Sequence, residues 1–296
     1  MRALVAGMES RLRRRYIRSH AEAVTAMPEL PDVELFRRLA ECHGAGEIVA
    51  KVEVLDPGSL DGATPEALQR RLKGRTLRSA RRHGKVLLLE TDDAAALAFH
   101  FGTNGSLHYV RRGDAAPRFA RLCLDFVKGG RLVYLNPRRI GKAHFAPGAS
   151  AFVTAAKLGP DVLEPSFDLA AFTVALAGRR QAIKAVLTDQ ARMAGIGNIY
   201  ADEILFQARL HPATPTDSLD KAMISRLFDA MKWVLQAAID CGAGAEAFID
   251  RLPEGFLVPE RRVGGHCPRC GAPIAQEKRG GRSGYFCPRC QPPPHA

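Results

Sequence analysis

The chain has 296 residues, of which 46% are hydrophobic and 25% charged, a composition typical of a soluble globular protein with about two domains. Forty-three lysines and arginines against 31 acids give a formal net charge of +12, which favours a polyanionic partner: nucleic acid first, an anionic membrane second. No apolar run approaches the ~20 residues that a membrane-spanning helix needs, so we expect no membrane protein.

Residues 1–26 form an arginine-rich leader ahead of the stretch MPELPDVE, which begins at Met27. The leader carries six arginines and two glutamates, so the rest of the chain keeps a net charge of +8. Transit peptides are also rich in arginine, which leaves organellar targeting open, but the two glutamates and the lack of a clean amphipathic face argue against one. We favour an upstream start with Met27 as the true initiator, a leader that is disordered or absent, and a cytoplasmic protein.

Pro31, followed by acids in a first turn, predicts a helix that ends near Gly44. Short alternating runs bounded by Gly, Pro and Asp come next and predict an antiparallel β-sandwich or barrel. Beyond a linker near residues 147–165 the apolar period changes to 3.6. Helices are expected at residues 167–177, 181–188, 198–207 and 219–240.

Four cysteines near the C-terminus form two CPRC pairs separated by sixteen residues: Cys267, Cys270, Cys287 and Cys290. Two thiolate pairs at this spacing can close one tetrahedral, structural Zn²⁺ site; two disulfides or coincidence are the alternatives. Residues 261–291 also hold seven Lys or Arg against one Glu. The pattern indicates a nucleic-acid-binding zinc finger, which by itself does not imply catalysis.

Seven motifs then follow one another in order: MPELPDVE, HGKVLLL, HFGTNGSL, NPRRIG, AIKAVLTDQ, GIGNIYADEILF and the four-cysteine finger with RSGYFC. From Met27 to about Gln291 the chain closely resembles the formamidopyrimidine-DNA glycosylase and endonuclease eight family of base-excision repair enzymes. The resemblance implies an α+β fold: an N-terminal helix and antiparallel β-sandwich (28–150), a helix-two-turn-helix domain (160–255) and the zinc finger (261–291). It also implies a monomer that binds damaged double-stranded DNA.

In that family the initiator methionine is removed and the N-terminal proline attacks C1′ of the damaged nucleotide, which would make Pro28 the nucleophile. An α-amine titrates near ~8, so part of it is neutral at pH 7, unlike a lysine near ~10.4. The resulting Schiff base leads to β,δ-elimination. We therefore expect a bifunctional DNA glycosylase and AP lyase, with 8-oxoguanine and formamidopyrimidine lesions as first choice and oxidised pyrimidines as second.

The resemblance assigns three further catalytic residues. Glu29 would be the general acid, although a helix-start carboxylate is the alternative interpretation. Lys85 would contact the phosphate beside the lesion and assist β-elimination, although a lysine in a turn is unremarkable by itself. Arg282 would neutralise the phosphate that leaves in δ-elimination.

Six residues are expected to contact DNA on the same ground. Arg179 and Lys184 match positions near the DNA backbone, and Asn198 follows Gly195 and Gly197, which can let a phosphate approach a helix N-terminus. The glycines can alternatively serve tight packing. The other three residues are expected to fill the space that a flipped base leaves: Arg138, Thr103 and Ile140.

The sequence departs from the family at several of these positions. Thr103 stands where a methionine is usual and Ile140 where an aromatic wedge is usual, which leaves the opposite-base preference open. Phe119 replaces a histidine, and the segment before the finger is short and lacks the usual VYGR of the lesion-capping loop. A non-catalytic DNA-binding zinc-finger protein is the alternative function, because retention of residues 1–26 would leave Pro28 as an unreactive amide.

Overall fold

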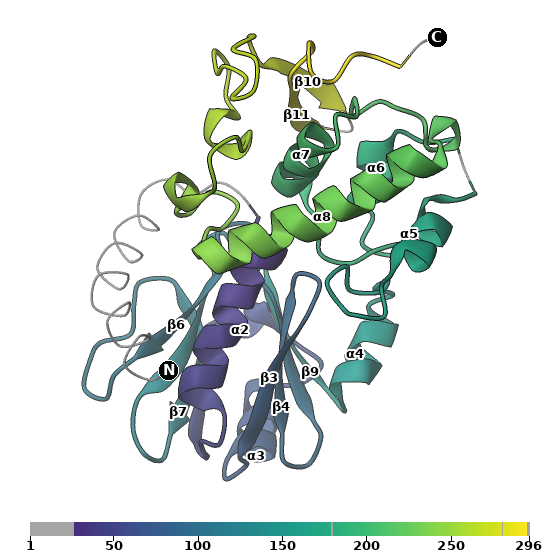
Figure 1. Cartoon of the computed structure of the whole chain (residues 1–296). Helices are drawn as coiled ribbons and strands as arrows, with labels where there is room; N and C mark the ends of the chain where they lie inside the picture. The colour runs from purple at the N-terminus through teal and green to yellow at the C-terminus, as the bar shows by residue number, and fades with distance from the viewer. Residues whose placement is uncertain (1–26, 179, 280, 295–296) are drawn as a thin grey trace.

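The computed structural model describes residues 27–178, 180–279 and 281–294, and the predicted contact Arg179 lies outside them. Along the chain a β-rich part is followed by a helical part and a small two-stranded module (Figure 1). The predicted α+β class, with its antiparallel sheets, is confirmed. Among the described residues, no helix combines the length and the apolar character needed to cross a bilayer.

Helix α2 (Leu30–Gly44) joins the β-rich part to the helical part. The first residue of the helix, Leu30, packs in the core of the helical part. Val33 and Phe36, further along the helix, pack in the core of the sandwich. Pro31 lies in the first turn, where its missing N–H costs no hydrogen bond. The residues just before the helix, Pro28 and Glu29, are therefore held where the two parts meet.

Two sheets form the sandwich, in the orders β1-β7-β8-β6 and β2-β9-β5-β4-β3. All of their pairings are antiparallel except β2 with β9. The strands are β1 (Val49–Val54), β2 (Leu60–Asp61), β3 (Leu77–His83), β4 (Val86–Thr91), β5 (Ala96–His100), β6 (Ser106–Val110), β7 (Ala120–Phe126), β8 (Arg131–Leu135) and β9 (Lys142–Ala146). Helix α3 (Pro65–Leu72) precedes β3, and the 3₁₀ helix η1 (Pro57–Ser59) precedes β2.

Strand β4 is apolar on both faces because both are covered. Leu87 and Leu89 point into the sandwich core, while Val86 and Leu88 pack against α4 (Ala149–Ala155) on the outer face. An alternating pattern would leave one face to water, so the continuous run VLLL is explained by the covering helix.

The helical part contains α5 (Leu169–Leu176), α6 (Ile183–Leu187), α7 (Asn198–Gln207) and α8 (Lys221–Cys241), each within three residues of the predicted bounds. Three 3₁₀ turns accompany them: η2 (Thr216–Ser218), η3 (Ile249–Arg251) and η4 (Val258–Glu260). The finger hairpin follows as β10 (Ala275–Arg279) and β11 (Arg282–Phe286). Helix α7 is buried almost all round, with eight of its ten residues in the interior, and it lies under the finger (Figure 1).

Candidate active site

The Glu29 side chain is anchored at the N-terminus of α7, although it lies far away in sequence. Its carboxylate accepts hydrogen bonds from the backbone N–H groups of Gly197 at 2.9 Å, Ile199 at 2.8 Å and Tyr200 at 3.1 Å. Only 3% of the residue is exposed. These N–H groups have no partner within the helix, and the helix dipole favours a negative charge beside them. The carboxylate is thus fixed next to Pro28.

The two glycines ahead of α7 have a different neighbour from the one expected. A Cβ on Gly197 would collide with the Glu29 side chain, and a Cβ on Gly195 would collide with Leu30. Gly195 also has a φ of +130°, which favours glycine. Both glycines therefore leave room for the side chains of Glu29 and Leu30. These contacts favour the alternative that the glycines serve tight packing.

Asp32 is a second buried carboxylate in the same place. It accepts hydrogen bonds from the backbone N–H of Glu29 at 2.9 Å and of Ala245 at 3.1 Å. Burial raises the pKa of Asp32 to about 7, and the charge of Glu29 adds to that rise. Asp32 thereby ties the start of α2 to the loop that follows α8.

Lys85 reaches this region from the turn between β3 and β4. His83 pairs with Val86, so Gly84 and Lys85 form a two-residue hairpin turn, and Gly84 takes a φ of +57°. Burial lowers the pKa of Lys85; the positive charge of Arg282 acts in the same direction, and the negative charges of Glu29 and Asp32 oppose it. Lys85 thus lies close enough to Glu29 and to Arg282 for each of their charges to act on its pKa.

Arg282 is held in place because the finger hairpin is bonded to α7. Asp202 in α7 accepts a hydrogen bond from the backbone N–H of Tyr285 at 3.0 Å and forms an ion pair with Arg261 at 2.9 Å. The amide of Asn198 donates to the Ser283 carbonyl at 2.8 Å. The hairpin that carries Arg282 is thus fixed along the length of α7.

Two of the predicted DNA contacts take part in this docking. Asn198 bonds to the finger as described, and Lys184 forms an ion pair with Asp202 at 2.5 Å. The sequence interpretation missed Asp202 and Arg261. One signal was available: Asp202 and Glu203 stand in the middle of the apolar run NIYADEILF. In a helix that is buried all round, a carboxylate has no access to water and needs a partner within the protein.

The four cysteines of the finger have the geometry of a zinc site. The Sγ atoms of Cys267 and Cys290 are 3.8 Å apart and those of Cys270 and Cys287 3.6 Å apart, and all four lie within 4.8 Å of one another. A tetrahedron with Zn–S bonds of ~2.3 Å has edges of about 3.8 Å, whereas a disulfide needs ~2.05 Å. The residues fit one structural Zn²⁺, and they do not fit two disulfides.

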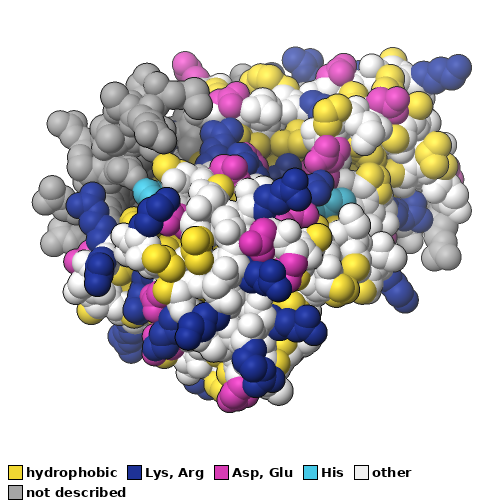
Figure 2. All heavy atoms as spheres, turned by 90° about the horizontal axis from the view of Figure 1, so that it is seen from below, with side chains coloured by type: hydrophobic (Ala, Val, Ile, Leu, Met, Phe, Trp, Pro, Cys, Tyr) yellow, Lys and Arg dark blue, Asp and Glu magenta, His cyan; other side chains and the backbone are white. Residues whose placement is uncertain are grey.

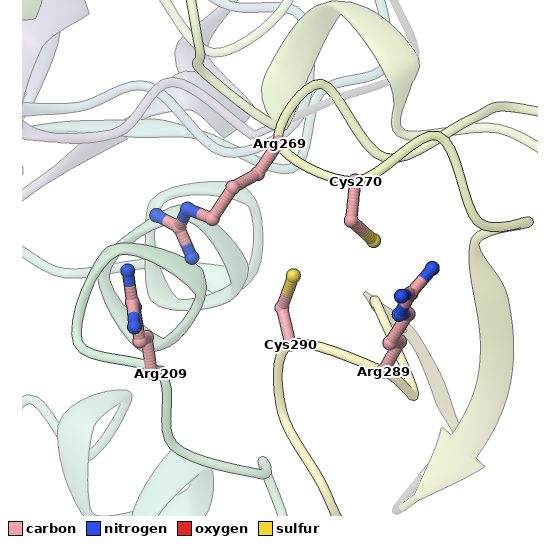
Figure 3. A pocket seen from close by; sticks show the side chains of 5 residues that line it. All are labelled: Arg209, Arg269, Cys270, Arg289 and Cys290. Carbon is pink, nitrogen blue, oxygen red and sulfur yellow. The ribbon is translucent and has the colours of Figure 1, made fainter.

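A cavity of about 420 Å³ lies beside this cluster (Figure 3). Its walls are three arginines, Arg209, Arg269 and Arg289, together with Cys270 and Cys290. Arg269 donates to the Phe206 carbonyl at 3.2 Å and to Gln207 Oε1 at 3.1 Å at the C-terminus of α7. Four thiolates around Zn²⁺ carry a net charge of −2, so these guanidinium groups offset the charge of a loaded site.

The three residues expected to fill the space of a flipped base come from two adjacent loops. Thr103 follows β5, and Arg138 and Ile140 follow β8. A Cβ on Gly102 would collide with the backbone of Ile140 and Gly141, so the loops are in contact. Arg138 is exposed and Ile140 is 53% exposed, whereas Thr103 is half-buried.

Phe119, the residue just before β7, supports the second of these loops. Its carbonyl accepts from the backbone N–H of Asn136 at 3.1 Å, and its ring, 38% exposed, contacts the Arg118 guanidinium at 4.6 Å. Seen from below the sandwich, lysines and arginines are spread over the face with acidic side chains between them (Figure 2). The positive charge is therefore not gathered into one patch on this face.

Three family models match the chain in succession. They are the formamidopyrimidine-DNA glycosylase N-terminal domain at residues 27–143, the H2TH domain of the same enzyme at residues 158–249, and a zinc finger found in that enzyme and in IleRS at residues 264–293. The three matches together cover most of the chain.

Among curated proteins, the chain is 37% identical to the formamidopyrimidine-DNA glycosylase of Thermomicrobium roseum, over 90% of this chain and 99% of that protein. The corresponding protein of Heliobacterium modesticaldum is also 37% identical, over 90% and 100%. Among solved structures, the Lactococcus lactis enzyme bound to DNA with an AP site has a TM-score of 0.80 at 30% identity, and its complex with DNA containing FAPY-dG has 0.81 at 30%. Each covers 90% of this chain and 100% of the other.

Proposed function

The chain belongs to the formamidopyrimidine-DNA glycosylase family, and from that premise we propose that it removes oxidised bases through a Schiff base on Pro28 and then cleaves the strand by β,δ-elimination. It is a DNA glycosylase of base-excision repair whose partner is double-stranded DNA, and it carries one structural zinc. One observation carries the proposal: three backbone N–H groups of the helical part fix the Glu29 carboxylate beside Pro28, and the charge of Glu29 acts on Lys85.

Pro28 and Glu29 carry out base release and the opening of the sugar. After removal of Met27, the secondary amine of Pro28 attacks C1′, the glycosidic bond breaks and the base leaves with its electron pair. Glu29 takes up the proton that the Pro28 nitrogen loses and donates it to the ring oxygen, which opens the sugar and leaves an iminium ion between Pro28 and C1′. The fixed position of Glu29 supports this role because a proton donor must be held within hydrogen-bond reach of its target.

Strand cleavage belongs to Lys85 and Arg282. Loss of a proton from C2′ expels the 3′ phosphate, and loss of a second proton expels the 5′ phosphate, while the iminium ion accepts the electrons. Lys85 contacts the phosphate beside the lesion and assists the first elimination, and Arg282 neutralises the phosphate that leaves in the second. Burial lowers the pKa of Lys85 and so favours its neutral form, which can accept a proton during the first elimination.

We further propose that Arg138, Thr103 and Ile140 fill the stack and that Arg179, Lys184 and Asn198 contact the DNA backbone. For Lys184 and Asn198 that contact is made from side chains that already hold the finger. A monomer that works in the cytoplasm agrees with the single-chain bacterial relatives.

Oxidised purines of the 8-oxoguanine and formamidopyrimidine type are the first-choice lesions, and oxidised pyrimidines the second. The complex of the Lactococcus lactis enzyme with FAPY-dG supports this order. This order of preference can be measured by single-turnover excision, with duplexes that carry each lesion opposite each of the four bases. Faster excision of oxidised pyrimidines than of both purine lesions would reverse the order.

Borohydride trapping tests the central step. Protein whose N-terminus is shown by intact mass to be Pro28 is incubated with duplex DNA containing an abasic site and reduced. We expect a covalent adduct, and we expect none from the full chain that starts at Met1, because its Pro28 nitrogen is an amide and has no nucleophilic lone pair. Absence of an adduct from the Pro28 protein, with DNA binding intact, would rule out the proposed nucleophile.

A further inference from the structure

The β3–β4 turn that carries Lys85 is bonded to the helical part of the protein through one buried carboxylate. Asp161, which precedes α5, has a side chain with no exposed surface. It forms an ion pair with Arg82 of β3 and accepts a hydrogen bond from the backbone N–H of Gly84 at 2.6 Å. The backbone N–H of Leu163 donates to its other oxygen at 2.8 Å. One carboxylate therefore joins the turn to the chain segment that leads into the helices.

Further bonds hold the same turn. Arg82 donates to the Gly84 carbonyl at 3.1 Å, so its guanidinium bridges Asp161 and the turn, and it also reaches Glu34 of α2 at 3.4 Å. The His83 ring bonds to the Gly159 carbonyl at 2.8 Å. A planar guanidinium can satisfy two acceptors at fixed angles, which a lysine in its place could not do.

Close packing leaves the turn no room to move toward the helical part. A Cβ on Gly84 would collide with Ala194, in the loop that precedes Gly195 and α7. The turn is consequently positioned by the loop whose following N–H groups hold Glu29. Lys85 is the residue after Gly84, and it has no side-chain hydrogen bond of its own among the bonds found in the described residues.

We propose that Asp161 and Arg82 are positioning residues for the lyase step: they set the place of Lys85 relative to Glu29 and so act on strand cleavage rather than on formation of the Pro28 adduct. This inference rests on the proposed role of Lys85. A displacement of the turn by about 1 Å is enough to slow a positioned step by up to ~100-fold. Pro28 and Glu29 are held by other bonds, at the N-terminus of α7, and their chemistry should persist.

The test separates the two steps in single-turnover experiments. Arg82→Lys, Arg82→Ala and Asp161→Asn are compared with the matched control Arg81→Ala, whose side chain is 59% exposed on the same strand and pairs with Glu90 at 3.7 Å. On abasic duplex DNA, borohydride trapping measures adduct formation and gel analysis measures strand cleavage. We expect cleavage to fall about tenfold or more in the Arg82 and Asp161 variants, with adduct formation within about threefold of the wild type.

A double-mutant cycle with Lys85→Ala decides whether the effect passes through Lys85. If it does, Arg82→Lys adds nothing to Lys85→Ala, and activity ranks wild type, Arg82→Lys, Arg82→Ala. Equal losses in trapping and cleavage, or full additivity with Lys85→Ala, would overturn the proposal and leave a purely structural ion pair. The conservative variants keep the test available if Arg82→Ala does not fold.

A different result is expected if Lys85 has no role in strand cleavage. If Lys85→Ala alone leaves cleavage unchanged, both the role of Lys85 and the present inference are wrong. The adduct on Pro28 would still form in that case, so the proposed nucleophile would survive.

Discussion

The two sets of residues expected to meet the damaged nucleotide are held in opposite ways. Glu29 and the Lys85 turn are fixed by buried bonds between the β-rich part and the helical part. The side chains of Arg138 and Ile140, in contrast, extend from loops in contact with one another and expose much of their surface. The end proposed to carry the chemistry is thus pre-organised, whereas the end proposed to fill the stack exposes its side chains.

The difference predicts how each end should respond to a substitution. A change at Glu29 would leave three N–H groups of α7 without a partner, which is costly in a buried place. A change at Ile140 alters a half-exposed tip and removes little packing.

The largest effect should come from Glu29→Gln. The amide cannot donate a proton to the sugar, and its NH₂ group faces helix N–H donors, so we expect excision to fall ~10²- to 10⁴-fold. Single-turnover excision measures the loss. Glu66→Gln, at the exposed start of α3, is the matched control. A loss below about tenfold would show that the anchored carboxylate is only structural.

Zinc removal should have the next largest effect. Without the metal the finger hairpin loses its own frame, and we expect DNA affinity to fall ~100-fold or more, while the sandwich, which has a separate core, stays folded. Fluorescence anisotropy with labelled duplex and circular dichroism measure the two quantities. Unchanged affinity after chelation, with metal loss verified, would contradict the prediction.

A smaller effect concerns Glu203 in α7, a buried carboxylate that accepts from the backbone N–H of Val258 at 2.8 Å. Burial raises the pKa of Glu203 from 4.5 to about 7. The folded protein then binds more protons than the unfolded chain between these values, so the free energy of unfolding should fall as pH rises from 4.5 to 7. Over this window Glu203 contributes roughly 2 kcal/mol of the fall.

Urea denaturation at pH 5 and pH 7.5 measures this change. In Glu203→Gln the fall should shrink, and in Glu66→Gln it should not. A fall of equal size in Glu203→Gln and the wild type would show that Glu203 is ionised throughout. In that case Glu203 would support α7 through its hydrogen bonds without contributing to the pH dependence of the free energy of unfolding.

The smallest effect should come from Ile140→Ala. Since the side chain is 53% exposed, we expect the free energy of unfolding to change by less than about 0.5 kcal/mol. Affinity for lesion DNA should fall about two- to fivefold as the wedge shortens. Val127→Ala, another exposed branched residue at 59%, is the control. A large loss of stability would remove the contrast between the two ends of the site.

Local patterns predicted much of the fold. The helix bounds near Gly44 and at residues 198–207 follow from period and turn residues, and the zinc site follows from cysteine spacing. Contacts between distant residues were not predictable in this way. Arg82 and Asp161 are 79 positions apart, and nothing near either residue in the sequence marks the other. The same limit hid Asp202 and the close contacts of Gly195 with Leu30 and of Gly197 with Glu29.

Helix α7 has a consequence for engineering. Its N-terminus holds Glu29, its middle holds the finger hairpin through Asp202, and Phe206 near its C-terminus packs in the core of the zinc module. The finger is thus not an independent cassette. A chimera that exchanges the finger alone would replace half of an interface, so functional grafts between relatives should require that α7 and the finger be transferred together.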